Sequence, residues 1–228
     1  MDFLSVVETG MYDDIETALK NGADPNIIDD DENLSPLLIA SKQCRLDIIK
    51  LLLKYGGEIN NGGYGPLFSI IYHKDTFILN ELINLGADPD VRDECGYTPL
   101  HILLECWGPE TDLTDLIEYL TPLTHTIDLP NRYGTSIIHD AACCNDKVFD
   151  FIFKHTKLFD CQDSEGRTPL MLAVVYGTDH IVRTLAKVSD VFICDHDEKN
   201  VYDYCYKKYH GNDRESRLTF INSFFRKN

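Results

Sequence analysis

Cysteine and histidine are the residue types best suited to bind metals or act as nucleophiles, and two stretches of this 228-residue chain place several of them close together in sequence. In the first stretch, His139 precedes the adjacent thiols Cys143 and Cys144. The second stretch, near the C-terminus, contains Cys194, His196, Cys205 and His210. Because no Cys-x-x-Cys pair occurs, the spacing is poor for zinc, and we predict no metal site and no cofactor. A redox or reactive role for Cys143-Cys144 remains an alternative.

Common catalytic motifs are absent from the sequence. It contains no Gly-x-x-x-x-Gly-Lys-Ser phosphate loop, no Gly-x-Ser-x-Gly nucleophile turn and no His-Glu-x-x-His zinc helix. We therefore predict no catalytic residues and a protein that is not an enzyme.

The elements that must position these side chains are marked by a hexapeptide that nearly repeats. Gly-Tyr-Thr-Pro-Leu-His at 96–101 returns as Gly-Arg-Thr-Pro-Leu-Met at 166–171, 70 residues later. A second signature follows 20 residues after a proline: Pro66 leads to Gly-Ala-Asp-Pro-Asp at 86–90, and Pro36 to Gly-Gly-Glu-Ile-Asn at 56–60. The Thr-Pro-Leu-His sequence and a period near 33 residues are the signature of one repeat class.

On these motifs the chain resembles the ankyrin-repeat family from end to end. Seven units, including both caps, start near Met1, Ile27, Asn61, Val91, Leu129, Cys161 and Ile193. The resemblance implies an all-α solenoid of stacked helix–turn–helix units with projecting β-hairpin fingers. We predict a single domain over 1–228, with an N-terminal cap at 1–26, central repeats at 27–192 and a C-terminal cap at 193–228.

The motif also has a physical logic. A threonine or serine hydroxyl caps the exposed N–H groups at a helix start, and proline suits the first helical position. The leucine that follows should face the core, as for Leu37, Leu67, Leu100 and Leu170. Gly22, Gly56 and Gly86 should end the second helix of their units, and Pro122 should break the helix before it. In the family, His101 and His139 would brace neighbouring loops by hydrogen bonds.

Composition limits the class of partner and the compartment. The net charge is −17 and the isoelectric point is about 4.7, so we predict no nucleic-acid partner, because phosphate binding needs clustered Lys and Arg. An acidic surface favours basic proteins or simply keeps the chain soluble. We see no signal peptide and no apolar run of 18 residues, so we predict no membrane partner. Scattered cysteines favour reduced thiols and a cytoplasmic location, with the nucleus as an alternative. We also predict a monomer.

In ankyrin proteins, partners meet the finger tips and the exposed positions of the first helices. Acidic residues and tyrosines fall in those positions here, and Trp107 lies in a short insertion at 105–112. Tyrosine and tryptophan are common binding hot spots, although these tyrosines could instead pack on adjacent fingers. The predicted partner-binding residues are Glu32, Tyr64, Tyr72, Glu94, Tyr97, Trp107, Arg132, Tyr133, Arg167 and Tyr176. Asn60 fits a loose family pattern for asparaginyl hydroxylation.

The predicted function is a non-catalytic protein–protein interaction module that sequesters or inhibits a regulatory protein through an acidic, tyrosine-rich concave face. The partner would be a protein with a basic face or segment. Short divergent repeats of this kind resemble viral or bacterial-effector ankyrin proteins, some of them similar to IκB, which implies NF-κB inhibition in a host cytoplasm. The alternative is a scaffold or substrate adaptor in a larger complex such as a ubiquitin ligase.

Overall fold

The structure is a computed structural model that describes residues 2–29, 34–60, 65–73, 75–106 and 113–208, with the side chains of Tyr72 and of 206–208 outside that description. Within these ranges every regular element is a helix. The chain divides into two compact units, Met1–Glu94 and Cys95–Asn228, which we treat separately. The single continuous domain and its cap boundaries stay a prediction.

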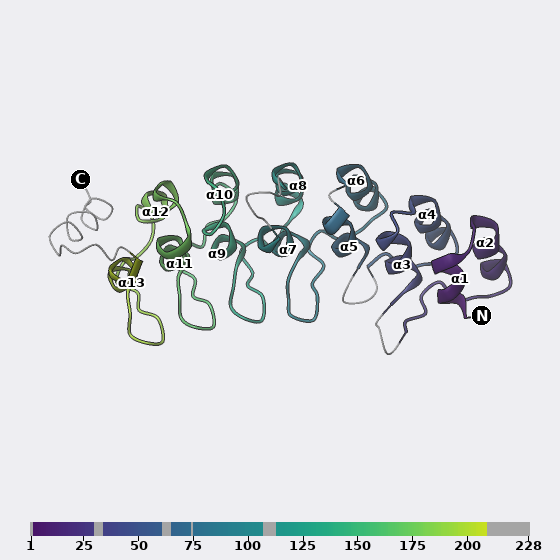
Figure 1. Ribbon diagram of the computed structural model, residues 1–228, viewed down its shortest axis with the longest axis horizontal. Coiled ribbons are helices and arrows are strands. Elements are labelled where there is room, and N and C mark those ends of the chain that lie inside the picture. Colours follow the sequence, from purple (N-terminus) through teal and green to yellow (C-terminus); the bar gives the residue numbers. More distant parts are fainter. Residues whose placement is uncertain (1, 30–33, 61–64, 74, 107–112, 209–228) are drawn as a thin grey trace. The chain divides into compact units, whose positions relative to one another are not determined.

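The first unit is a stack of helix pairs. The helices are α1 (Phe3–Thr9), α2 (Tyr12–Lys20), α3 (Pro36–Lys42), α4 (Leu46–Lys54), α5 (Pro66–His73) and α6 (Thr76–Asn84). The first helix of each pair packs against the first helix of the next pair, α1 on α3 and α3 on α5, and α2 also contacts α4 (Figure 1).

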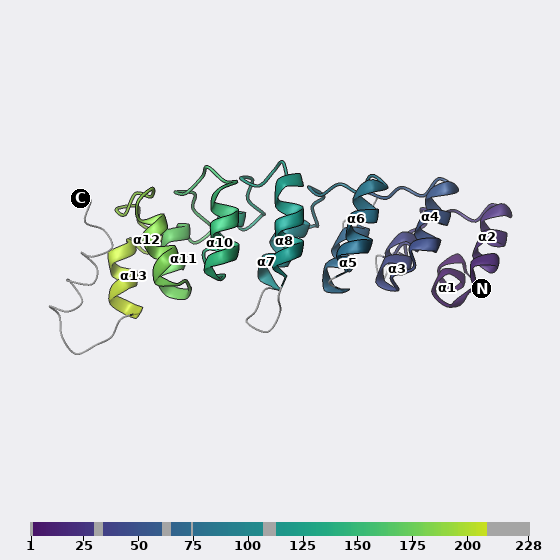
Figure 2. The ribbon, with the colours of Figure 1, turned by 90° about the horizontal axis from the view of Figure 1, so that it is seen from above.

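The second unit repeats the arrangement. Its helices are α7 (Pro99–Glu105), α8 (Thr114–Leu120), the short 3-10 helix η1 (Thr121–Leu123), α9 (Ile137–Ala141), α10 (Asp146–Phe153), α11 (Pro169–Tyr176), α12 (Asp179–Leu185) and α13 (Val201–Lys208). In this unit α7, α9, α11 and α13 contact one another in sequence and form one row, while α8, α10 and α12 form a second row. Figure 2 shows the same helices side by side from above.

The first helices begin where the Thr-Pro motif predicts. Thr98 precedes Pro99, and the threonine Oγ accepts a hydrogen bond from the backbone N–H of His101 at 3.4 Å. Thr168 caps α11 in the same way, accepting from Met171 N–H at 3.3 Å. A side-chain acceptor satisfies one of the N–H groups that a helix start leaves without an intrahelical partner. The repeated hexapeptide is therefore a helix start in both copies, as predicted.

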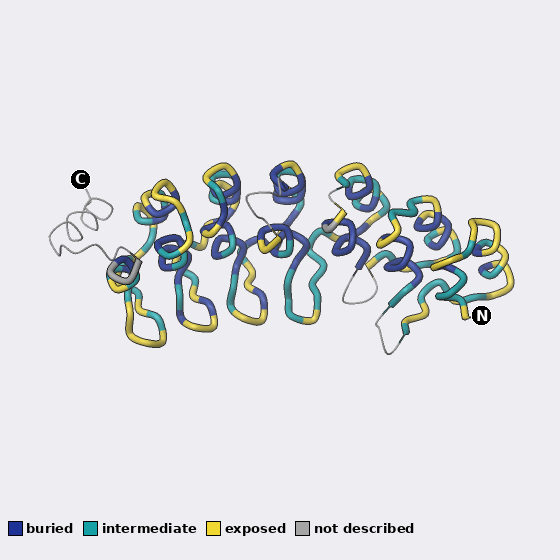
Figure 3. Tube along the Cα trace, in the orientation of Figure 1, coloured by how far each residue is buried: buried dark blue, intermediate teal, exposed yellow. Residues whose placement is uncertain are grey.

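The core lies between the two rows of helices in each unit. The predicted core leucines are all buried: Leu37, Leu67, Leu100 and Leu170. Phe149 of α10 and Ile49 of α4 are fully buried on the second row. Figure 3 shows burial concentrated where the helix rows face each other and exposure at the finger tips and outer helix surfaces. Since this burial runs from pair to pair, each repeat is stabilised mainly by its neighbours.

The predicted helix ends are also found. Gly56 has a φ of 92° and follows α4, where Gly57 N–H donates to Leu52 C=O at 2.9 Å, the left-handed ending that favours glycine. Pro122 does end its helix, because α8 stops at Leu120 and continues as a single 3-10 turn. There, Thr121 Oγ donates to Ile117 C=O at 2.6 Å and compensates for the lost glycine ending.

The fingers of the second unit are hairpin-shaped turns that contain no β-strand within the described residues. In the finger of residues 128–135, Asn131 N–H donates to Thr135 C=O at 2.9 Å and closes the turn. Neighbouring fingers are linked by single backbone bonds, such as Ser164 N–H to Tyr133 C=O at 2.7 Å and His196 N–H to Glu165 C=O at 3.0 Å. These bonds hold the fingers of this unit in a row.

Asn60, the predicted modification site, bridges two turns of the first unit. Its Nδ2 donates to Gly86 C=O at 3.0 Å, and its Oδ1 accepts from Asp88 N–H at 2.8 Å. Asn26 makes the same two contacts one unit earlier, to Gly56 C=O and Glu58 N–H. The asparagine is therefore a linker between successive turns, and its hydroxylation stays a prediction.

Candidate functional site

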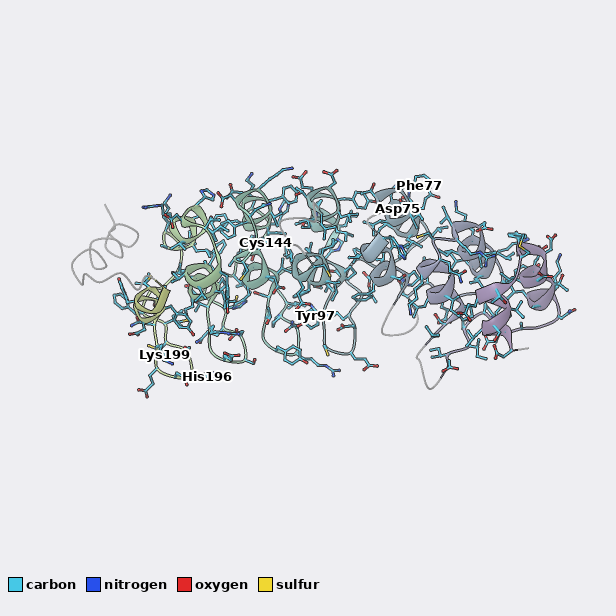
Figure 4. The ribbon with its side chains drawn as sticks, in the orientation of Figure 1. Asp75, Phe77, Tyr97, Cys144, His196 and Lys199 are labelled. Atoms are coloured by element: carbon cyan, nitrogen blue, oxygen red, sulfur yellow. The ribbon has the colours of Figure 1, made fainter. Side chains whose placement is uncertain are left out.

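The centre of the candidate surface in the second unit is a pair of tyrosines on adjacent fingers. Tyr97 lies just before α7 and is half-buried, with its ring edge-on to buried His101 at 5.8 Å between centroids. Tyr133, on the next finger, lies 6.2 Å from the Tyr97 ring and is 50% exposed. Figure 4 shows Tyr97 at the base of its finger, below α7. The pair therefore packs together, as the alternative interpretation expected, and still presents aromatic surface to solvent.

Three other predicted residues are exposed, and a fourth is engaged within its own finger. Glu94, Arg132 and Tyr176 are exposed, and Tyr176 at the end of α11 keeps 66% of its surface. Arg167 instead forms ion pairs with two carboxylates, Asp163 at 2.8 Å and Glu165 at 3.1 Å. Its charge is thus neutralised within its own finger, so Arg167 stabilises that finger more than it offers a free contact to a partner.

The remaining predicted residues lie outside the described structure. Glu32, Tyr64 and Trp107 fall in the segments that are not described, and of Tyr72 only the backbone in α5 is described. Their proposed roles in partner binding stay predictions.

Sequence reasoning missed Asp140, the most unusual polar side chain in the second unit. It lies in the middle of α9, and its Oδ2 atom is buried with no hydrogen-bond partner. Burial holds the pKa of the Asp140 carboxyl well above its ordinary range, and the nearby charge of Glu105 raises it further. Its signal in the sequence is positional, because Asp140 follows the framework His139 at a position where the two strong motif copies carry Ile102 and Leu172.

Glu105, at the end of α7, acts electrostatically on both Asp140 and Tyr97. Burial raises the pKa of the Tyr97 hydroxyl, and the charge of Glu105 and a hydrogen bond to it raise that pKa further. Glu105 is itself exposed. We use "the Glu105–Asp140 pair" for these two carboxylates, which come from adjacent first helices that contact each other.

The adjacent thiols differ in exposure and share a low reactivity. Cys143 is exposed and Cys144 is buried; Figure 4 labels Cys144 in the turn between α9 and α10. Although Cys143 is exposed as a residue, desolvation of its thiol and the charge of Asp140 raise its pKa to about 11, and burial raises the pKa of Cys144 to about 12. Because the thiolate is the reactive form, these shifts disfavour the redox or nucleophilic interpretation.

A labelling experiment checks this assignment. At pH 7 we expect Cys143 to react with iodoacetamide about 100-fold more slowly than an ordinary thiol, because a pKa near 11 leaves little thiolate. Cys194, an exposed thiol on a finger, is the internal control. Peptide mass spectrometry over time measures both rates in one sample, and equal rates for the two cysteines would contradict the assignment.

His139 has the structural role expected from the family. It is fully buried, its Nδ1 accepts from Ser136 N–H at 3.2 Å, and its Nε2 donates to Arg167 C=O at 3.0 Å. Burial lowers its pKa, so the ring is held neutral. The histidine thus connects the start of α9 to the finger of residues 160–167.

The described residues contain neither a cluster of metal ligands nor a membrane-spanning helix. In those ranges, no three His, Cys, Asp or Glu side chains come together as metal ligands. None of the described helices is long and apolar enough to cross a membrane.

Comparisons with known proteins agree with this architecture. A family model described as ankyrin repeats (3 copies) matches residues 3–93 and 110–197. The chain is 30% identical over 183 residues to protein glp-1 of Caenorhabditis elegans, covering 74% of this chain and 14% of glp-1. It is 31% identical over 105 residues to putative ankyrin repeat protein L271 of Acanthamoeba polyphaga mimivirus, covering 43% and 14%. The chain thus spans about one seventh of each of these relatives.

A solved structure is similar in fold. The ankyrin repeat domain of Bcl-3, described as a unique member of the IκB protein family, aligns with a TM-score of 0.70 and 18% identity, covering 90% of this chain and 93% of that domain. At this identity the likeness supports the fold alone. The Thr-Pro helix starts, the paired helix rows, the linked fingers and the family match over most of the chain show that this protein belongs to the ankyrin-repeat family.

Proposed function

We propose that this protein is a non-catalytic interaction module that binds and sequesters a regulatory protein through a basic segment of that partner. Ankyrin repeats are protein–protein interaction modules, and no catalytic family is indicated for this chain. The observation that carries the proposal is the half-exposed Tyr97–Tyr133 pair on adjacent fingers of the second unit, with the carboxylates of Glu105 in α7 and Asp140 in α9 acting on Tyr97. Aromatic hot spots with a charged surround are typical of specific protein interfaces.

Charge supports a basic partner. The fingers of residues 128–135, 160–167 and 190–199 carry eight Asp or Glu and three Lys or Arg. Two of the three cations are paired within their own fingers, Arg167 with Asp163 and Lys199 with Asp197 at 2.7 Å. The excess of carboxylates would attract a basic segment and speed association at low salt. A nuclear-localisation segment has this chemistry, and its capture would hold a partner in the cytoplasm in the manner we expect of IκB-like proteins.

The test is affinity capture from a cell lysate at low and high salt, with partners identified by mass spectrometry. We expect wild-type protein to retain a partner with a basic segment at 50 mM NaCl and to lose most of it at about 500 mM NaCl, where the Debye length is a few ångströms. Tyr133→Ala should reduce retention about tenfold or more, because removing a central aromatic costs on the order of 2 kcal/mol.

Phe77→Ala is the matched control, since Phe77 belongs to the first unit, is 65% exposed and is labelled on α6, a second helix of its pair, in Figure 4. Equal retention by wild type and Tyr133→Ala would contradict the proposal. Recovery of a stoichiometric multiprotein assembly, instead of one regulator, would favour the scaffold or adaptor alternative.

A further inference from the structure

A charged residue occupies an aliphatic position in the second unit. Asp140 stands immediately after the framework His139, where the equivalent residues after His101 and Met171 are Ile102 and Leu172. The same position in α3 is Ile39, which is buried. In α5 the position carries a small buried polar residue, Ser69, so Asp140 is the charged exception, and a carboxylate there replaces packing surface with a group that loses hydration.

The carboxylate has no compensating partner of its own. Its Oδ2 atom is buried without a hydrogen bond, although the residue as a whole is only half-buried. Most buried polar atoms in folded proteins are hydrogen-bonded, and one that is not needs an explanation. The residue as a whole is partly exposed, so an external group reaches this oxygen once neighbouring side chains shift locally.

The surroundings of Asp140 add a second negative charge at this site. Glu105 of α7 repels Asp140, and the neighbouring Tyr97, Cys143 and Cys144 carry no positive charge. The positive charge of Arg167 works to lower the pKa of Cys143, but Arg167 is held in ion pairs with Asp163 and Glu165 of its own finger. The site therefore holds two carboxylates and no available cation among the neighbours that act on it.

We propose that the Glu105–Asp140 pair is a seat for the guanidinium group of one arginine on the partner, an inference that rests on the proposed function. The planar guanidinium offers five N–H donors, enough to reach a buried carboxylate oxygen and a second carboxylate together. The Tyr97–Tyr133 rings beside the pair suit the flat face of the same group, which stacks on aromatic rings better than an ammonium does.

The probe is a fluorescein-labelled nona-arginine peptide, with binding measured by fluorescence anisotropy at low salt. We expect wild-type protein to bind it, and Asp140→Asn and Glu105→Gln each to weaken binding by about tenfold, because a charge-assisted hydrogen bond in a shielded site is lost. Asp115→Asn is the matched control, since Asp115 is an exposed residue of α8 on the second helix row. It removes the same charge and should change affinity by less than about twofold.

Thermal unfolding shows that the substituted protein is folded. Because the pKa of Asp140 is raised in the folded state, its charge destabilises the fold at pH 7. The favourable contribution is present below the unfolded pKa and is lost as pH rises through the folded one. Asp140→Asn should therefore unfold at a higher temperature than wild type at pH 7, and weaker binding by that variant cannot then be attributed to misfolding.

The outcomes separate the seat from the proposed function. If wild type binds nona-arginine and all three variants bind equally well, the seat is wrong and the basic-partner proposal stands. If wild type binds nona-arginine no better than nona-citrulline, the basic-partner proposal fails and the seat fails with it. Nona-lysine should bind several-fold more weakly than nona-arginine, and equal binding would overturn the guanidinium assignment.

Discussion

Replacing Gly134 with alanine is expected to destabilise the second unit by about 3 kcal/mol, the largest effect we predict for a single added methyl group. Gly134 has a φ of 72°, a conformation that costs an L-residue about 1–2 kcal/mol. An added Cβ would also lie 2.9 Å from the backbone of Asp163 on the next finger. The backbone bond from Ser164 N–H to Tyr133 C=O requires this approach, so the alanine would separate the two fingers.

Gly86→Ala provides the matched control for this prediction. Gly86 has a φ of 95°, but a Cβ there would have nothing within 4 Å. Gly86→Ala should lower the free energy of unfolding only by the backbone cost, about 1 kcal/mol. The additional loss in Gly134→Ala then measures the cost of the close contact between the two fingers. Urea unfolding followed by circular dichroism gives both values. If the two glycine variants lose the same stability, the fingers do not depend on this contact.

His139→Ala is expected to destabilise the protein by a similar amount, about 3 kcal/mol. The ring is fully buried, and its removal leaves a cavity, takes the ring acceptor from the N–H of Ser136, and leaves the C=O of Arg167 with only its bond from Asp163 N–H. The substitution should also affect partner binding, because the lost bonds connect the start of α9 to the next finger and so fix the positions of the residues there. Asp140, which follows in the same helix, would lose its fixed location.

The matched control for His139 is His180→Ala. His180 is largely exposed and pairs with Asp150 at 2.7 Å on the second helix row, so its loss should cost less than about 0.5 kcal/mol. Chemical unfolding of the two variants at pH 8 gives the comparison. Comparable losses for both histidines would show that burial and the finger bond at His139 contribute nothing.

The same histidine predicts a pH dependence. Burial lowers the pKa of His139 in the folded protein, while the unfolded chain has the ordinary value of about 6.5. The stability it contributes is present above the unfolded pKa and is lost as pH falls through the lowered folded pKa. The difference in unfolding free energy between wild type and His139→Ala should therefore narrow below pH 6.5. A constant difference between pH 8 and pH 5 would contradict the neutral, buried ring.

Local elements of the fold could be predicted because each depends on residues close in sequence. A Thr98-Pro99 helix start, the glycine ending at Gly56 and the break at Pro122 all follow from backbone chemistry within one turn. The buried leucines follow from the same register. The family itself follows from the repetition of these local signals at a constant spacing.

The candidate site could be predicted only in part. The Tyr97–Tyr133 contact and the ion pairs of Arg167 depend on how fingers approach one another, and residue type alone does not distinguish a free arginine from a braced one. Asp140 was missed because an aspartate in a helix is ordinarily solvated. Its departure from Ile102 and Leu172 is visible in the sequence, but its lost hydration is not.

The amino-acid sequence by itself determined the repeat class, the helix boundaries near the motifs and the acidic character of the chain, since these come from local backbone preference and composition. Only the tertiary structure decided which carboxylates are compensated and which are not. Burial and pairing depend on groups that are distant in the chain, as Glu105 is from Asp140, and they meet only when successive repeats stack. The Glu105–Asp140 pair is therefore a property of the stacked repeats and of no single motif.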